Sequence, residues 1–219
     1  MKSKLIVALD VDSYERAVKL VKELSQLVDV FKVGGQLFTR VGPKIIEFIN
    51  TRGKKCFLDL KFHDIPNTVA KAVESASALH VFMLTVHASG GAEMLRAATS
   101  VPNRPLLLGV TVLTSVGGDV KDEVLRLAQL AKDCGLDGVI ASPQEIRPLR
   151  AALGSDFLVV TPGIRPAWAE AGDQKRVMTP SEAIVAGANY VVIGRPIVAA
   201  DKPVEVAQRV TTEMARASA

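Results

Sequence analysis

The chain has 219 residues, 48% of them hydrophobic and 23% charged, which is enough apolar material to bury one sizeable core. No apolar run approaches the roughly 20 residues of a membrane span, and the first apolar stretch is too short for a secretory signal. The net charge of +4 comes from scattered basic residues with few aromatics, which disfavours nucleic acid and suits an anionic small molecule. We therefore expect a cytoplasmic, folded protein without a membrane or nucleic-acid partner.

Short apolar or β-branched runs recur along the chain, separated by longer stretches with apolar residues at helical spacing. The first helical stretch is 14–27, preceded by the capping residues Asp12-Ser13. A later helix begins with Thr179-Pro180-Ser181-Glu182, a polar cap followed by proline. Nearly continuous apolar strands that alternate with helices indicate a parallel sheet covered by helices. The expected strands are 4–9, 29–33, 55–60, 81–86, 106–112, 137–141, 157–161 and 190–194.

Eight such strand–helix units predict an α/β fold, a single (β/α)₈ TIM barrel over residues 1–219 with its active site at the C-terminal ends of the strands. A doubly wound open sheet is the alternative. The first strand is followed by Leu9-Asp10-Val11-Asp12, however, and not by the glycine-rich dinucleotide fingerprint. The stretch 162–178 is long and rich in glycine, proline and charge, so we expect it to form a lid.

Metal-ligating and redox patterns are absent from the sequence. Cys56 and Cys134 form no CxxC pair and belong to no His/Cys cluster, so we expect two buried thiols, with no disulfide and no zinc site. The histidines lie near no carboxylate cluster with metal-ligand spacing, and we expect structural roles for them: His63, His80 and His87. The sequence therefore predicts no metal and no cofactor.

Charged residues lie where the first three strands end. Asp10 follows the first strand and Lys32 lies near the end of the second, while Asp59 and Lys61 end the third. Asp59 and Lys61 are two residues apart and so share one strand face, where Lys32 of the neighbouring strand can pair with Asp59. Because an isolated buried charge is costly, we predict an array of alternating Lys and Asp at the barrel mouth. The alternative is an ion-pair network that only stabilises the barrel.

A second polar cluster follows strands seven and eight. Gly163 and Arg165 come after one strand, and Gly194 and Arg195 after the other. Barrels of this kind commonly bind phosphate at this place, where glycine lets the backbone approach and arginine offers a guanidinium fork. We therefore predict a phosphorylated substrate, with turn glycines beside solvated arginines as the alternative.

The segment 59-DLKFHDIPNT-68 resembles the DxKxxDIPxT signature of the orotidine 5′-monophosphate decarboxylase family at every fixed position. The resemblance spans almost the whole chain and implies conversion of orotidine 5′-monophosphate (OMP) to UMP and CO₂ in de novo pyrimidine biosynthesis, without a cofactor or metal. Other segments agree with bacterial members in the same order: 7-VALD-10, 31-FKVG-34, 110-VTVLTS-115, 161-TPGIR-165, 172-GDQKR-176 and 193-IGRPI-197.

The resemblance implies a catalytic Lys-Asp-Lys-Asp array made of Lys32, Asp59, Lys61 and Asp64. Asp59 would face the scissile carboxylate of the substrate. Lys61 would stabilise the carbanion at C6 of the pyrimidine and then protonate it.

The resemblance also implies a homodimer with shared active sites, in which Asp64 and Thr68 reach into the site of the neighbouring subunit. Within one chain, Asp10 and Lys32 would hold the ribose hydroxyls. The implied contacts to pyrimidine, phosphate and lid are Thr114, Arg165, Gln174, Gly194 and Arg195.

Three other interpretations stay open. A sugar-phosphate decarboxylase related to 3-keto-gulonate 6-phosphate decarboxylase shares a DxKxxD motif on a similar barrel but uses magnesium. The IPxT continuation, the Lys32 segment and the loop with Gln174 favour the nucleotide enzyme. A ribulose-phosphate epimerase would share only the barrel and its phosphate site, and a catalytically silent barrel would bind a nucleotide without turnover.

Overall fold

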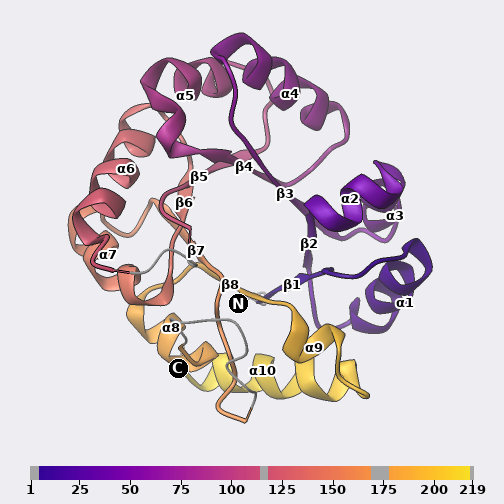
Figure 1. Ribbon diagram of the computed structural model, residues 1–219. Coiled ribbons are helices and arrows are strands. Elements are labelled where there is room, and N and C mark those ends of the chain that lie inside the picture. Colours follow the sequence, from indigo (N-terminus) through magenta and orange to yellow (C-terminus); the bar gives the residue numbers. More distant parts are fainter. Residues whose placement is uncertain (1–4, 114–117, 169–177, 218–219) are drawn as a thin grey trace.

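The computed structural model describes residues 5–113, 118–168 and 178–217. Figure 1 looks into a ring of strands surrounded by an outer ring of helices. Neighbouring strands run parallel and pair in sequence order, and β8 pairs with β1 to close the barrel. The predicted (β/α)₈ barrel is confirmed, and the open sheet is excluded.

The strands begin and end within two residues of the runs predicted from the sequence. The largest extension is at the third strand, which continues past its expected end at residue 60. The strands are β1 (Leu5–Ala8), β2 (Val30–Gly34), β3 (Lys55–Phe62), β4 (Met83–His87), β5 (Leu106–Val110), β6 (Gly138–Ile140), β7 (Leu158–Thr161) and β8 (Tyr190–Ile193).

Helices follow the strands, with two short 3₁₀ turns, η1 (Ala88–Gly90) and η2 (Pro143–Glu145). Two helices follow β2, because Gly42 adopts a positive φ of 63° at the end of the first and Pro43 precedes the second. The helices are α1 (Tyr14–Leu24), α2 (Gly35–Val41), α3 (Lys44–Thr51), α4 (Pro66–Ala78), α5 (Gly91–Thr99), α6 (Lys121–Asp133), α7 (Ile146–Leu153), α8 (Pro180–Ala186), α9 (Arg195–Val198) and α10 (Pro203–Ala217).

Both predicted helix caps are present. The Ser13 hydroxyl accepts a hydrogen bond from Arg16 N, so α1 begins where expected, although it ends at Leu24 and not at residue 27. At α8, Thr179 and Glu182 exchange hydrogen bonds between side chain and backbone in a complete capping box.

Side-chain alternation along the strands divides the core into two layers. Outward-facing residues pack between the barrel and the helices, and inward-facing residues fill the barrel with Ile6, Ala8, Val30, Phe57, Met83, Leu108, Val160 and Val192. Continuing the same alternation by one inward position places polar groups at the C-terminal ends of four adjacent strands: Asp10, Lys32, Asp59 and Thr85.

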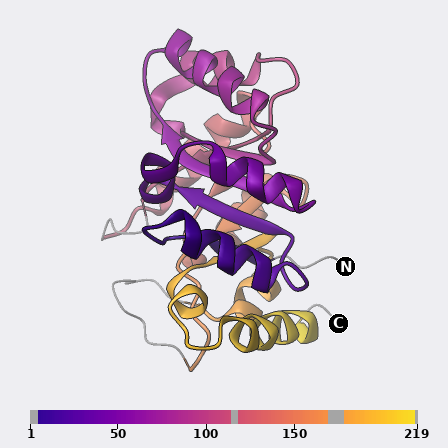
Figure 2. The same cartoon turned by 90° about the vertical axis from the view of Figure 1, so that its right-hand side faces the viewer.

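The first and last helices are neighbours in the outer ring. Figure 2 shows α1 beside α10, and residues of the two helices are in contact. None of the helices within the described ranges is long and apolar enough to cross a membrane.

The two cysteines lie in the outer layer of the core. Cys56 on β3 is fully buried, and Cys134 at the end of α6 is 5% exposed, as expected for unpaired apolar thiols. Burial raises the pKa of the Cys56 thiol to about 12.

Candidate active site

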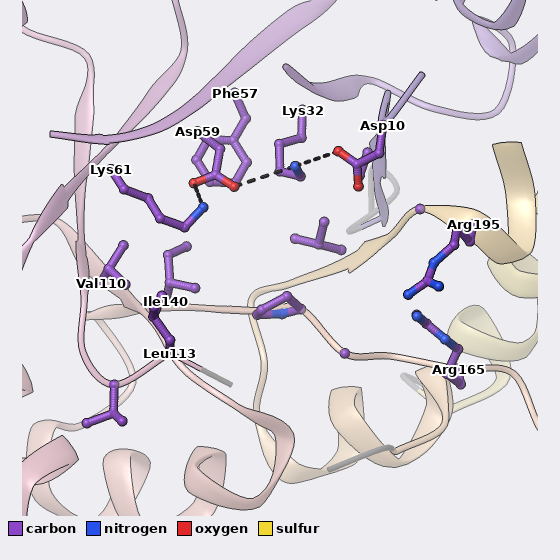
Figure 3. A pocket seen from close by; sticks show the side chains of 16 residues that line it. Asp10, Lys32, Phe57, Asp59, Lys61, Val110, Leu113, Ile140, Arg165 and Arg195 are labelled. Carbon is purple, nitrogen blue, oxygen red and sulfur yellow. Dashed lines mark hydrogen bonds and ion pairs between the residues drawn. The ribbon is translucent and has the colours of Figure 1, made fainter. Parts of the chain in front are cut away.

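A cavity of about 230 Å³ lies at the C-terminal ends of the barrel strands (Figure 3). Charged side chains form one wall, and Phe57, Val110 and Ile140 contribute an apolar surface. The cavity is on the scale of a small molecule. It is lined by eight of the residues that the sequence analysis proposed for the site: Asp10, Lys32, Asp59, Lys61, Gly163, Arg165, Gly194 and Arg195.

Asp59 lies at the centre of the charged wall. Its Oδ1 atom is 2.9 Å from Lys61 Nζ, and its Oδ2 atom is 3.5 Å from Lys32 Nζ. Lys32 Nζ also lies 3.1 Å from Asp10 Oδ1, so the four side chains form a continuous row of alternating charge (Figure 3).

This arrangement keeps Asp59 ionised. Only 12% of its side chain is exposed, and burial on its own raises the pKa of the carboxyl group. The charges of Lys32 and Lys61, with hydrogen bonds from Lys61 and Thr85, outweigh burial and hold that pKa below its ordinary value.

A bulge in β3 carries Lys61 into the pocket. While β4 advances two residues, from Leu84 to Val86, β3 advances four, from Leu58 to Phe62. Lys61 lies inside this bulge with a φ of 52°, a left-handed conformation that costs a non-glycine residue about 1–2 kcal/mol. The bulge explains why β3 continues beyond the run predicted from the sequence.

Thr85 is a member of the site to which the sequence analysis gave no role. Its buried hydroxyl donates to Asp59 Oδ1 over 3.0 Å and accepts from Lys61 N over 2.9 Å. Strand alternation was the available signal, since Thr85 lies two residues after the inward-facing Met83, on the strand beside Asp59.

Two arginines lie at the other end of the pocket. Figure 3 shows the guanidinium groups of Arg165 and Arg195 pointing toward each other. Arg165 N donates to Met178 O, so the two described ends of the segment 162–178 are joined beside the pocket. A Cβ atom on Gly194 would lie 3.2 Å from Asp10 Oδ2, a tight contact with the charged row. Two adjacent guanidinium groups suit a doubly charged anion.

Two nominated residues, Asp64 and Thr68, are not among the residues that line this pocket. Asp64 and Thr68 are exposed at the start of α4, and Asp64 Oδ1 accepts a hydrogen bond from Ile65 N over 2.6 Å. Ile65 between them is 66% exposed. Thr114 and Gln174, like residues 169–177 of the expected lid, lie outside the described residues.

Two histidines lie next to one another beside the site. The rings of His63 and His87 are 5.3 Å apart, and the pKa of His87 is lowered by burial and by the nearby charges of His63 and Lys61. Within the part of the chain that the structure describes, no three His, Cys, Asp or Glu side chains are grouped so that they could hold a metal ion.

Comparisons with known proteins agree over nearly the full chain. Residues 3–210 match the model of the Orotidine 5'-phosphate decarboxylase / HUMPS family. A Syntrophotalea carbinolica protein named orotidine 5'-phosphate decarboxylase is 52% identical, over 99% of this chain and 96% of its own. One of the same name from Syntrophomonas wolfei is 50% identical, over 96% and 97%.

Among solved structures, orotidine 5'-phosphate decarboxylase from Lactobacillus acidophilus aligns with a TM-score of 0.81 and 39% sequence identity. The alignment covers 97% of this chain and 99% of that one. With sequence and fold in agreement along its length, this chain belongs to the orotidine 5'-phosphate decarboxylase / HUMPS family.

Proposed function

We propose that this protein decarboxylates OMP to UMP and CO₂, a reaction of pyrimidine nucleotide synthesis. One observation carries the proposal: Lys61 Nζ lies 2.9 Å from Asp59 Oδ1 in a pocket whose other end holds Arg165 and Arg195. A proton donor and a phosphate-binding pair thus share one small cavity. Relatives at 52% and 50% identity bear the name of this activity.

Lys61 supplies the positive charge and the proton that the reaction needs. When the bond between C6 and the carboxylate carbon breaks, CO₂ leaves and the electron pair stays on C6 in the plane of the ring. The ring carbonyls do not delocalise that pair, so the protein must stabilise it electrostatically. The Lys61 ammonium group does so, delivers a proton to C6 and regains one from water. The chemistry needs no cofactor.

The neighbouring charges hold Lys61 in place for this step. Asp59 binds Lys61 through one oxygen and Lys32 through the other, and its ionised carboxylate faces the substrate carboxylate. Asp10 and Lys32 lie next along the row and bind the ribose hydroxyls. As the substrate carboxylate becomes uncharged CO₂, repulsion from Asp59 is relieved.

The arginine end of the pocket binds the 5′-phosphate. Arg165 and Arg195 offer charged donors, and Gly194 leaves room for close approach. Phosphate binding far from C6 supplies free energy that can organise the charged row. By family resemblance we assign Gln174 to the phosphate and Thr114 to the pyrimidine.

The active form is a homodimer in which Asp64 and Thr68 complete the partner's site. Both are exposed in the single chain, on either side of the exposed apolar Ile65. Asp64 then completes a Lys-Asp-Lys-Asp array across the interface.

The test follows the ultraviolet absorbance of OMP mixed with purified protein in excess EDTA. We expect conversion to UMP by the wild type and a loss of about 10²–10⁴-fold in kcat for Lys61→Ala, since that variant lacks the proton donor. Binding of UMP should persist in this variant, because the phosphate and ribose contacts are unchanged.

The matched control is Lys202→Ala, which removes an exposed lysine paired with Glu205 on the protein surface. It should retain wild-type turnover. Full activity of Lys61→Ala would refute its role as proton donor. No conversion by the wild type would refute the proposed activity and direct the assay to sugar phosphates with magnesium, the nearest alternative.

A further inference from the structure

We infer that Thr85 is a positioning residue of this site, whose single hydroxyl fixes the Asp59 carboxylate and the Lys61 backbone together. The inference rests on the proposed decarboxylase function. Among the residues that the structure describes, Thr85 is the one side chain that hydrogen-bonds to both residues, to the carboxylate of Asp59 and to the main-chain N–H of Lys61.

Because of the bulge in β3, the backbone N–H of Lys61 needs a hydrogen-bond acceptor other than the backbone of β4. Ladder pairing with β4 is interrupted between Leu58 and Phe62, and the N–H of Lys61 lies in that interval. An unpaired backbone N–H in a buried position is costly. The Thr85 hydroxyl oxygen accepts from this N–H over 2.9 Å and so supports the left-handed backbone at Lys61.

The hydroxyl group of Thr85 also donates a hydrogen bond to Asp59. It points to Asp59 Oδ1, the same oxygen that binds the Lys61 ammonium group, over a distance of 3.0 Å. Both ends of the Lys61 residue, its main-chain nitrogen and its Nζ, are therefore tied to one small cluster. Burial of Thr85 at 0% exposure keeps water from replacing it there.

A hydroxyl can do what other groups of this size cannot, since it donates and accepts at once. Valine has the same shape as threonine and fills the space, but it leaves the Lys61 N–H and one lone pair of Asp59 Oδ1 without their partner. Serine keeps the hydroxyl and loses only a methyl group. The two substitutions therefore separate hydrogen bonding from packing.

The experiment compares kcat and KM for OMP in Thr85→Val and Thr85→Ser. We expect kcat of Thr85→Val to fall about tenfold or more while KM changes little, because Asp59 and Lys61 are displaced while the phosphate contacts of Arg165 and Arg195 remain. Thr85→Ser should recover kcat to within about threefold of the wild type, since it restores both hydrogen bonds.

The matched control is Thr161→Val on β7. Thr161 is also fully buried, but its hydroxyl finds no hydrogen-bond partner within the described residues. Replacing it with valine should leave kcat unchanged, and the urea midpoint unchanged or higher. If Thr85→Val does not fold, Thr85→Ser and Thr85→Ala form a second pair that differs only in the hydroxyl.

A purely structural role predicts a different pattern. Thr85→Val would then lower the urea midpoint while its folded fraction kept wild-type kcat, and that result would overturn the inference while leaving the proposed function intact. Equal loss of kcat in Thr85→Ser and Thr85→Val would overturn it too, because the hydroxyl would not matter. If the wild type does not convert OMP, the proposed function fails, and this inference fails with it.

Discussion

At the scale of single residues, the site depends on one carboxylate that serves two cations. Asp59 is largely buried, yet Lys32 and Lys61 keep its pKa below the ordinary value. Paired burial of this kind stabilises the charged form only while all partners are present. The same contacts therefore link the charge state of the site to the stability of the fold.

Asp59 should give the protein a pH-dependent stability in acid. Its pKa is lower in the folded state than the roughly 3.9 of an unfolded aspartate, so the unfolded state binds more protons in this range. The stability that Asp59 contributes is fully present above that unfolded value, and it is lost as the pH falls through the folded value. The free energy of urea unfolding, measured from about pH 5 to about pH 3, should fall more steeply for the wild type than for Asp59→Asn.

The control for this measurement is Asp201→Asn, which removes an exposed carboxylate outside the site. Its slope with pH should stay close to that of the wild type. Equal slopes for Asp59→Asn and the wild type would show that the pKa of Asp59 is not lowered by folding.

Sequence patterns identified the charges of the site better than its neutral groups. Asp10, Lys32 and Asp59 stood out because charges are rare at inward strand positions. Thr85 could be placed among the polar residues at the strand ends but received no role, since threonine is common in strands and reveals no partner by itself. The left-handed backbone at Lys61 could not be predicted from the sequence either, because a bulge depends on how two strands pair and not on either strand alone.

At the scale of elements, strand positions followed from sequence more closely than helix ends did. Apolar β-branched runs specify a buried strand directly, whereas α1 ends at Leu24, before the apolar periodicity ends at Leu27. Helix starts were better marked, because a capping side chain binds the backbone N–H groups of the first turn. The capping box of α8 is the clearest example.

Thr179→Ala should destabilise the protein by about 1 kcal/mol. The substitution removes the hydroxyl that accepts from Glu182 N at the start of α8, and α8 packs against α10. Urea unfolding measures the loss. The control is Thr212→Ala on α10, whose exposed hydroxyl donates to Gln208 O and accepts from Gln208 Nε2 of the same helix. That variant should stay within about 0.5 kcal/mol of the wild type, and equal losses in both would show that the cap contributes nothing.

At the scale of the whole molecule, the barrel brings the pocket residues together and leaves Asp64 outside the pocket. The pocket walls come from residues far apart in the sequence, from Asp10 to Arg195, which barrel closure brings together. Asp64 and Thr68 lie exposed in the single chain. Sequence spacing alone could not show that Asp64 lies outside the pocket of its own chain.

Mixing two inactive variants should restore activity if Asp64 acts across the interface. In a hybrid of Lys61→Ala with Asp64→Ala, one site carries both changes and the other carries none. Random exchange of equal amounts makes half of the dimers hybrid, so about a quarter of all sites regain wild-type composition. OMP turnover before and after mixing measures this.

Mixing Lys61→Ala with Asp59→Asn is the control, because both changes lie in the same chain's pocket and no hybrid site is intact. Recovery with Asp64→Ala but not with Asp59→Asn supports a shared site. No recovery in either mixture, with exchange of subunits verified by mass, would place Asp64 in the site of its own chain or outside the reaction.

Burial protects the Cys56 thiol from oxidation and alkylation. Oxidants and alkylating reagents attack the thiolate, and Cys56 combines full burial with a pKa of about 12. Its sulfur is therefore shielded both sterically and chemically while the barrel is closed. Any modification found on Cys56 therefore shows that the layer between β3 and its helices opened earlier and exposed the thiol. The modified fraction of Cys56 measures how often such opening has occurred.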